Sequence, residues 1–175
     1  MEADLARTSQ IQPVALPLRP CVGVMLINGR GRVWVGRRSP KWLANKAAPI
    51  WQMPQGGINP REAPERAAVR ELYEETGIRS AEIIGEIADW LTYELPENLL
   101  GVALKGRFRG QKQRWFAMRF TGLDREIDIS GGKNHKREFD AWKWVDIERV
   151  PKLIVPFKRE TYLTVVREFQ HLAAG

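Results

Sequence analysis

The chain has 175 residues, of which 43% are hydrophobic and 28% charged, with a net charge of +7 and a pI near 9.9. This composition excludes a disordered chain, and the length suits one domain with a proper core rather than two. The basic balance favours polyanionic partners such as RNA or nucleotides, and no stretch reaches the roughly 20 apolar residues of a membrane span.

The first 38 residues predict an arm and a hairpin. Residues 1–18 show no hydrophobic period, so we expect a mobile arm there. Two apolar runs then flank the turn residues Asn28 to Gly31, and residues 21–38 are predicted to form a β-hairpin. The single cysteine, Cys21, lies in the first run, which predicts a buried strand thiol rather than a nucleophile.

The later elements follow from hydrophobic alternation and helical spacing. Residues 158–172 place Tyr162, Val165 and Phe169 on one face, which predicts a packing helix. The other expected elements are a loop at 39–50, an extended piece at 51–53, a helix at 64–76, and strands at 81–95, 113–122 and 139–146. Strands and helices mixed in this way predict an α/β fold, with a central mixed β-sheet flanked by helices.

The helix at 64–76 carries three carboxylates on one face. At about 3.6 residues per turn, Glu71, Glu74 and Glu75 fall within roughly 100° of arc. Like charges this close repel, and Arg70 can pair with Glu74 four residues later and offset part of the repulsion. The expected result is a nest of hard oxygen ligands, which suits Mg²⁺ or Mn²⁺ far better than zinc.

The residues around this helix define its ends. Pro64 suits the first helical turn, and Gly77 suits the left-handed position just after the last turn. Before the helix, Gln55-Gly56-Gly57 is expected to form a flexible turn. Such a turn can bring the Gly56 carbonyl close to a cation held by the carboxylates.

These residues together form a longer pattern. The spacing is G-x5-E-x7-R-E-U-x-E-E-x-G-U, with U a bulky aliphatic residue, and it is carried by Gly56, Glu62, Arg70, Glu71, Leu72, Glu74, Glu75, Gly77 and Ile78. It resembles the Nudix box at every fixed position, which implies the Nudix α/β/α sandwich in a single domain over residues 19–175. The resemblance implies two groups of residues: metal ligands at Gly56, Glu71, Glu74 and Glu75, and structural supports at Glu62, Arg70 and Gly77.

Segments outside the box, from about Leu18 to Phe169, resemble bacterial RNA pyrophosphohydrolases of this family. Those enzymes hydrolyse the 5′-triphosphate of RNA, release pyrophosphate and leave a 5′-monophosphate that ribonucleases prefer. The resemblance implies two or more Mg²⁺ or Mn²⁺ ions, catalytic roles for the three helix carboxylates, and a metal-binding or general-base role for Glu138. It implies these substrate-binding residues: Arg19, Arg38, Tyr93, Phe157 and Lys158.

Further cations extend the substrate prediction. Arg38 and Lys158 are expected to be exposed and to contribute little to folding. Lys112 and Arg114 are candidates for more phosphate contacts, and the basic segment before Glu138, residues 130–137, is a candidate for contact with a nucleic-acid backbone.

Two alternatives stay open beside RNA 5′-pyrophosphohydrolase. Dinucleoside polyphosphate hydrolases look similar through the same segments, and the long loop at 39–50, with Ile50 before the tryptophan, resembles them. A non-catalytic RNA- or nucleotide-binding module need not keep the three helix carboxylates, and this chain has all three. In each case RNA 5′ ends or nucleotide polyphosphates are the expected partners of a cytoplasmic monomer that does not bind membranes.

Overall fold

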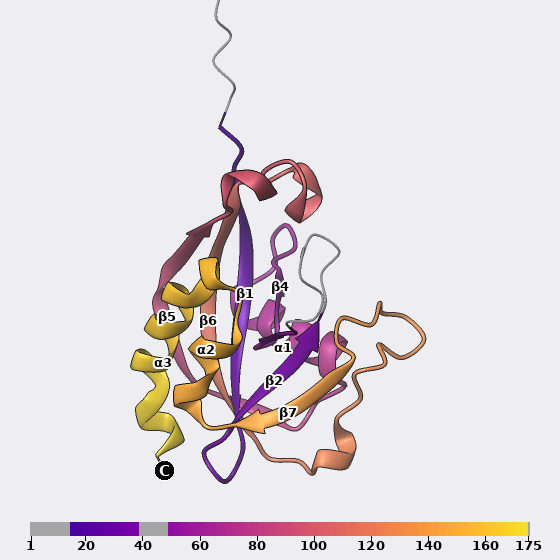
Figure 1. The fold of residues 1–175 in the computed structure, drawn as a ribbon. Coiled ribbons are helices and arrows are strands. Elements are labelled where there is room, and N and C mark those ends of the chain that lie inside the picture. The colour runs from indigo at the N-terminus through magenta and orange to yellow at the C-terminus, as the bar shows by residue number, and fades with distance from the viewer. Residues whose placement is uncertain (1–14, 39–48, 175) are drawn as a thin grey trace, which may run out of the picture.

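Seven strands form one mixed sheet in the computed structural model, which describes residues 15–38 and 49–174 (Figure 1). The strands are β1 (Leu18–Ile27), β2 (Val33–Arg38), β3 (Ile50–Gln52), β4 (Gln55–Gly57), β5 (Ala81–Glu94), β6 (Gly110–Phe120) and β7 (Ala141–Val145). Their order is β3-β2-β1-β6-β5, with β4 paired to β1 and β7 to β2. The β1–β6 pair is parallel, whereas the other pairs are antiparallel.

Helices cover both faces of this sheet. The α-helices are α1 (Pro64–Thr76), α2 (Val150–Leu153) and α3 (Arg159–Ala173). The short 3₁₀ helices are η1 (Glu97–Leu99), η2 (Ala103–Gly106), η3 (Asp124–Glu126), η4 (Ile147–Arg149) and η5 (Pro156–Lys158). Figure 1 shows α2 and α3 in front of the sheet and α1 behind it.

Alternation along β1 separates two hydrophobic cores. Val22, Val24 and Leu26 pack with the buried residues of α1, whereas Met25 and Ile27 pack with those of α2 and α3. Successive side chains of a strand point to opposite faces, so each core lies between the sheet and one helical layer. The predicted α/β/α sandwich with a central mixed sheet is therefore confirmed.

The predicted hairpin exists only at its base. Among the described residues, β1 and β2 pair only at Ile27 and Val33, next to the turn. The turn closes with the Asn28 N–H donating to the Arg32 carbonyl at 2.9 Å, and Gly31 has a φ of +72°. Beyond it, β2 leaves β1 to pair with β3 and β7.

The strand β4 replaces a predicted flexible turn. Residues 55–57 pair antiparallel with Cys21, Val22 and Gly23 of β1, in the space left where β2 diverges. The prediction of a turn there was wrong, because two adjacent glycines give no local sign of pairing with a strand more than 30 residues earlier. This pairing anchors the start of the segment that leads into α1.

The predicted arm at 1–18 and loop at 39–50 lie mostly outside the described residues. Of the arm, Leu18 already belongs to β1, and the Arg109 guanidinium donates to the Leu16 carbonyl at 2.7 Å. Pairing with the rest of the domain thus begins before the predicted boundary at residue 19. Over residues 15–38 and 49–174, no helix is long and apolar enough to cross a bilayer.

Candidate functional site

One cavity of about 650 Å³ lies beside α1 and β4 and reaches the end of β5. Ten residues singled out in the sequence line it together: Arg19, Arg38, Gly56, Glu71, Glu74, Glu75, Tyr93, Glu138, Phe157 and Lys158. They come from segments spread over most of the chain, so their convergence is a property of the fold. The support residues Glu62, Arg70 and Gly77 lie outside the lining.

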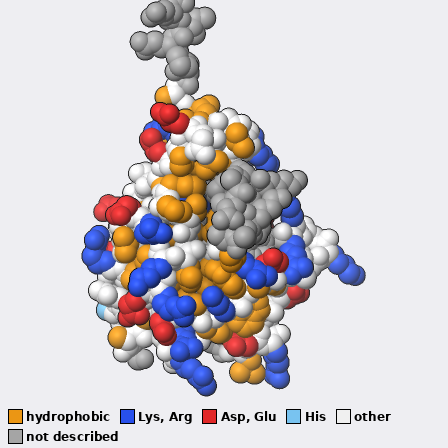
Figure 2. All heavy atoms as spheres, viewed as in Figure 1, with side chains coloured by type: hydrophobic (Ala, Val, Ile, Leu, Met, Phe, Trp, Pro, Cys, Tyr) orange, Lys and Arg blue, Asp and Glu red, His pale blue; other side chains and the backbone are white. Residues whose placement is uncertain are grey.

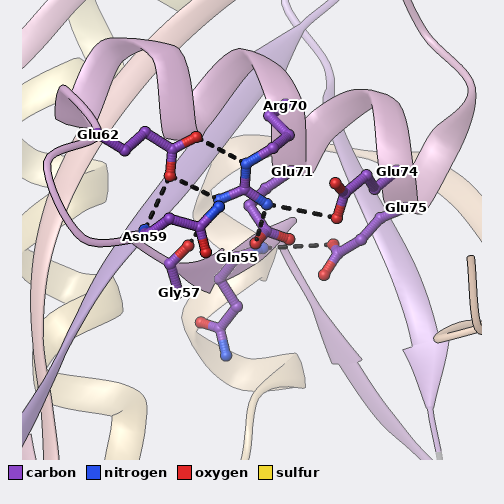
Figure 3. A network of polar contacts seen from close by, with 8 residues as sticks. All are labelled: Gln55, Gly57, Asn59, Glu62, Arg70, Glu71, Glu74 and Glu75. Carbon is purple, nitrogen blue, oxygen red and sulfur yellow. Dashed lines mark hydrogen bonds and ion pairs between the residues drawn. The ribbon is translucent and has the colours of Figure 1, made fainter.

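Arg70 joins α1 to the segment before it (Figure 3). Its guanidinium donates to both carboxylate oxygens of Glu62, at 2.7 and 2.9 Å, and to the Gly57 carbonyl at 2.8 Å. The Asn59 N–H donates to the same Glu62 carboxylate at 2.8 Å. The Arg70 hydrogen bonds lower the pKa of Glu62 to about 2. This bidentate pair fixes the path of residues 57–62 over the helix.

Arg70 also holds two of the three helix carboxylates. Its Nη1 donates to Glu71 at 2.8 Å and to Glu74 at 3.4 Å (Figure 3). Within the part of the chain that the structure describes, no three acidic, histidine or cysteine side chains converge closely enough to hold one ion, so the role of these carboxylates as metal ligands stays a prediction. The Arg70 guanidinium is the counterion of Glu71 and Glu74 in this structure.

Glu75 is a buried carboxylate without an ion-pair partner among the described residues. It is only 8% exposed, and it accepts a hydrogen bond from the Gln55 N–H at 3.3 Å. Among the described residues no cation lies within ion-pair distance of it. Burial, and then the charges of Glu71 and Glu138, raise the pKa of Glu75 well above its ordinary value. A buried carboxylate of this kind favours an added cation.

Two glycines of β4 let charged side chains approach the backbone. A Cβ atom at Gly56 would overlap the Glu71 carboxylate, and one at Gly57 would lie against the Arg19 guanidinium. Glu71 itself is largely buried, and this burial raises its pKa despite the Arg70 hydrogen bond. The absence of side chains at 56 and 57 is thus a condition for bringing Glu71 and Arg19 to the same strand.

The two predicted cations Arg38 and Lys158 differ in their surroundings. Arg38 lies 3.7 Å from the Glu138 carboxylate, and its side chain is 31% exposed. The prediction that Lys158 is exposed was wrong, because it is only 7% exposed. Burial, and then the nearby Arg38 charge, lower the pKa of Lys158 to about 7. This burial has no local signal in the sequence, because it arises from packing of η5 against β5.

An aromatic pair continues the cavity wall next to Lys158. The rings of Tyr93 and Phe157 lie 5.6 Å apart at 43°, and the Lys158 ammonium lies 5.2 Å from the Tyr93 ring centre. Tyr93 is buried, whereas Phe157 is half-buried. The cavity therefore presents carboxylates, then cations, then an aromatic surface.

Lys112 and Arg114 do not reach the cavity. Both contact the exposed Trp90, with their cationic atoms 5.0 and 5.8 Å from its ring centre, and Arg114 also pairs with Glu86 at 3.1 Å. Alternation along β6 explains the difference, because Gln111 lines the cavity and its neighbour Lys112 points to the other face. Their predicted role in this site was wrong.

Other lining residues were missed in the sequence. They are Gln55, Leu95, Ala103, Leu104, Lys105, Arg107, Phe108 and Gln111, with His135 and Lys136 from the basic segment already noted. Most lie in the connection between β5 and β6, which has no motif and reaches the site only through pairing of those strands. Cys21 is buried as predicted, and burial raises the pKa of its thiol to about 11.

Comparison of the sequence with known proteins identifies its family. Residues 17–165 match the NUDIX domain. A protein named RNA pyrophosphohydrolase from Bradyrhizobium sp. (strain ORS 278) is 53% identical over 162 residues, which cover 91% of this chain and 96% of that one. Another of the same name, from Brucella abortus (strain 2308), is 52% identical over 171 residues, 95% of each chain.

Two solved structures share the fold at low sequence identity. A C. elegans Ap4A hydrolase binary complex has a TM-score of 0.63 and 19% identity, and covers 90% of this chain and 99% of its own. The E. coli dihydroneopterin triphosphate pyrophosphohydrolase has a TM-score of 0.62 and 20% identity, with 89% and 99% covered. At these identities the likeness concerns the fold alone.

Proposed function

We propose that this chain, which belongs to the NUDIX family, hydrolyses the 5′-triphosphate end of RNA to a 5′-monophosphate and releases pyrophosphate. The observation that carries the proposal is one cavity in which carboxylates, cations and an aromatic surface follow one another. The high identity to proteins named RNA pyrophosphohydrolase, over nearly the whole chain, supports the choice of substrate.

The residues present fit divalent cations. Glu75 is buried without a cation at ion-pair distance among the described residues, and the Glu71 carboxylate lies against the Gly56 backbone because that position has no Cβ. Carboxylate and carbonyl oxygens suit Mg²⁺ or Mn²⁺. Two or more such ions would be held by Glu71, Glu74 and Glu75, with the Gly56 carbonyl and Glu138. When bound, they supply charge neutralisation on the polyphosphate and activation of the attacking water.

The cations of the cavity orient the phosphates. Arg38 and Lys158 lie between the carboxylates and the aromatic pair, and Arg19 lies against the β4 backbone on the same cavity. Lys158 gains most from an anionic ligand, because a phosphate offsets the cost of burying its ammonium. These residues hold the triphosphate so that its α-phosphorus faces the carboxylates.

Glu138 and Phe157 complete the assignment. Glu138 is exposed at the cavity and only weakly paired with Arg38, so its carboxylate is free to accept a proton from the attacking water. Phe157 and Tyr93 offer an aromatic face to the first nucleobase, a contact that any base can make.

A substitution at Glu75 tests the site. We expect Glu75→Gln to lower turnover of triphosphorylated RNA by roughly two orders of magnitude or more, a loss of the size typical for a transition-state contact. We also expect the metal-free variant to melt at the same temperature or higher, because an unpaired buried charge is removed. Glu65→Gln, on the exposed first turn of α1, is the matched control. Near-normal turnover of the Glu75 variant with Mg²⁺ present contradicts the assignment.

The setting of the activity follows from its substrate. A 5′-monophosphate end is the form that ribonucleases prefer, so the reaction promotes mRNA decay in the cytoplasm. Diadenosine polyphosphates carry the same anhydride bonds, and their hydrolysis is the alternative that a substrate comparison must exclude.

A further inference from the structure

The connection between β5 and β6, residues 95–109, forms an arch over the aromatic end of the cavity. It contains η1 and η2, and its base is closed by the Leu95 N–H donating to the Arg109 carbonyl at 2.7 Å. Leu95, Leu99 and Ala103 pack with Tyr93 in a small cluster separate from the two main cores. Figure 1 shows this arch at the end of the molecule away from the C-terminus.

The arch contains two consecutive non-glycine residues in the left-handed region. Leu104 has φ and ψ of 52° and 37°, and Lys105 has 58° and 21°. Such backbone is strained and persists where the surrounding structure demands it, commonly at ligand-binding segments. Here Leu104 packs against the small cluster with Tyr93, while Lys105 stays exposed on the cavity wall. The strained turn thus directs the Leu104 side chain to the cluster and the Lys105 side chain to the cavity.

Lys105 and Arg107 present uncompensated positive charge to the cavity. Both line it, both are exposed, and neither has an ion pair within the described residues. Arg109 differs, because its guanidinium pairs with Glu94 at 3.1 Å and also binds the Leu16 carbonyl. The arch therefore uses Arg109 for its own closure and leaves Lys105 and Arg107 available to an anion.

The order of groups in the cavity defines which anion reaches the arch. Leu104 and Phe157 pack against the small cluster that contains Tyr93, and all three residues line the cavity. A triphosphate held at the carboxylates would direct its ribose and 3′ side toward these rings. In RNA the next group on that side is a phosphodiester. A free nucleoside triphosphate has none there, and a dinucleoside polyphosphate carries its second nucleoside at the other end of the phosphate chain.

We propose that Lys105 and Arg107 bind the phosphodiester backbone that follows the first nucleotide, and so select RNA over free nucleotides and dinucleoside polyphosphates. This inference rests on the proposed function and names the residues that would determine its specificity. For single-stranded nucleic acid, a plot of log affinity against log salt concentration falls with a slope of roughly 0.7 per phosphate contact. Removing two such contacts should therefore reduce this slope by about 1.4.

The test compares three substrates with a charge-matched control. The double variant Lys105→Gln, Arg107→Gln keeps long side chains and removes two charges. The control, Arg149→Gln with Lys152→Gln, removes two exposed charges outside the cavity lining. Initial rates are measured with a triphosphorylated oligoribonucleotide, a nucleoside triphosphate and diadenosine tetraphosphate, at about 50 and 200 mM salt, a range over which phosphate contacts have large effects.

We expect the arch variant to lose kcat/KM only for the oligoribonucleotide. The ratio of the wild-type kcat/KM to that of the variant on this substrate should shrink about sevenfold between the low and the high salt, because of the expected change in slope. Equal losses on all three substrates, or unchanged kcat/KM for RNA at low salt, overturn the inference. Absence of RNA turnover by the wild-type protein overturns the proposed function itself, and the inference with it.

Discussion

At the scale of single residues, Lys158 has the most unusual environment. Its ammonium is buried, and its pKa falls from 10.5 to about 7 in the folded protein, first because of burial and then because of Arg38. Between these two values the unfolded chain holds the proton and the folded chain does not, so unfolding becomes less favourable as pH rises through this window. Below about pH 7 the cost of burying the charge is fully present.

We therefore expect Lys158→Met to unfold at higher denaturant than wild type at pH 6, by an amount on the order of a few kcal/mol. The gap should close as pH rises toward 10, while turnover is low throughout because a phosphate contact is lost. Denaturant unfolding of the metal-free proteins at several pH values measures it, with exposed Lys152→Met as control. A gap that is the same at pH 6 and pH 10 would contradict the account of Lys158.

Glu62 gives the opposite pH dependence. Its folded pKa of about 2, held down by Arg70, lies below the ordinary value of 4.5. Its contribution to stability is present above pH 4.5 and is lost as pH falls toward 2. Glu62→Gln should cost about 1–2 kcal/mol at pH 7, as expected for a charge-assisted hydrogen bond at a partly buried site. Thermal unfolding of both proteins at pH 7 and at about pH 3 should show the difference shrinking. A difference that does not change with pH would rule out the carboxylate as its cause.

The sequence predicted which residues lie on α1, but it did not predict the burial or the pairing of the charged side chains. The carboxylates and Arg70 lie within one helix, so spacing alone placed them on one face. Burial of Lys158 depends on contacts with β1 and β5, far away in the sequence. Capture of Glu71 by Arg70 depends on rotamers, which a spacing pattern does not define.

At the scale of elements, the glycines of β4 allow the Glu71 carboxylate of α1 to lie against the strand. A Cβ at position 56 would overlap the Glu71 carboxylate, whereas one at Gly29 would meet nothing within 4 Å. We expect Gly56→Ala to displace Glu71 and lower turnover at least about a hundredfold, the scale of losing one transition-state contact. Gly29→Ala should keep wild-type turnover. Steady-state rates at saturating Mg²⁺ decide the matter, and full activity of Gly56→Ala would show that Glu71 tolerates a side chain there.

Local signals predicted α1 fully and the sheet only in part. Pro64 and Gly77 mark the two ends of α1, and both ends are where the sequence predicted them. The ten-residue parallel pairing of β1 with β6 has no local signal, because it joins strands separated by about half the chain. For the same reason the sequence overstated the hairpin and missed β4.

At the scale of the whole molecule, the fold brings carboxylates, cations and aromatic rings from distant parts of the sequence to one cavity. Three carboxylates come from α1 and Glu138 from the segment before β7, whereas the aromatic rings come from β5 and η5. The cations come from β1, β2, η5 and the arch. The arch could not be predicted, because it has no sequence motif and its residues reach the cavity only through the pairing of β5 with β6. The resemblance to a family supplied most site residues, while the gradient from carboxylate to aromatic surface required the structure.

The central claim is that this gradient serves the 5′-triphosphate of RNA. The most direct measurement is a competition between triphosphorylated RNA and diadenosine tetraphosphate at equal concentration and matched Mg²⁺, with label on the β- and γ-phosphates of the RNA. We predict faster cleavage of RNA, with the label released chiefly as pyrophosphate. A preference for the dinucleotide of about tenfold or more, roughly 1.4 kcal/mol in activation free energy, would contradict the account and make dinucleoside polyphosphate hydrolysis the function of this site.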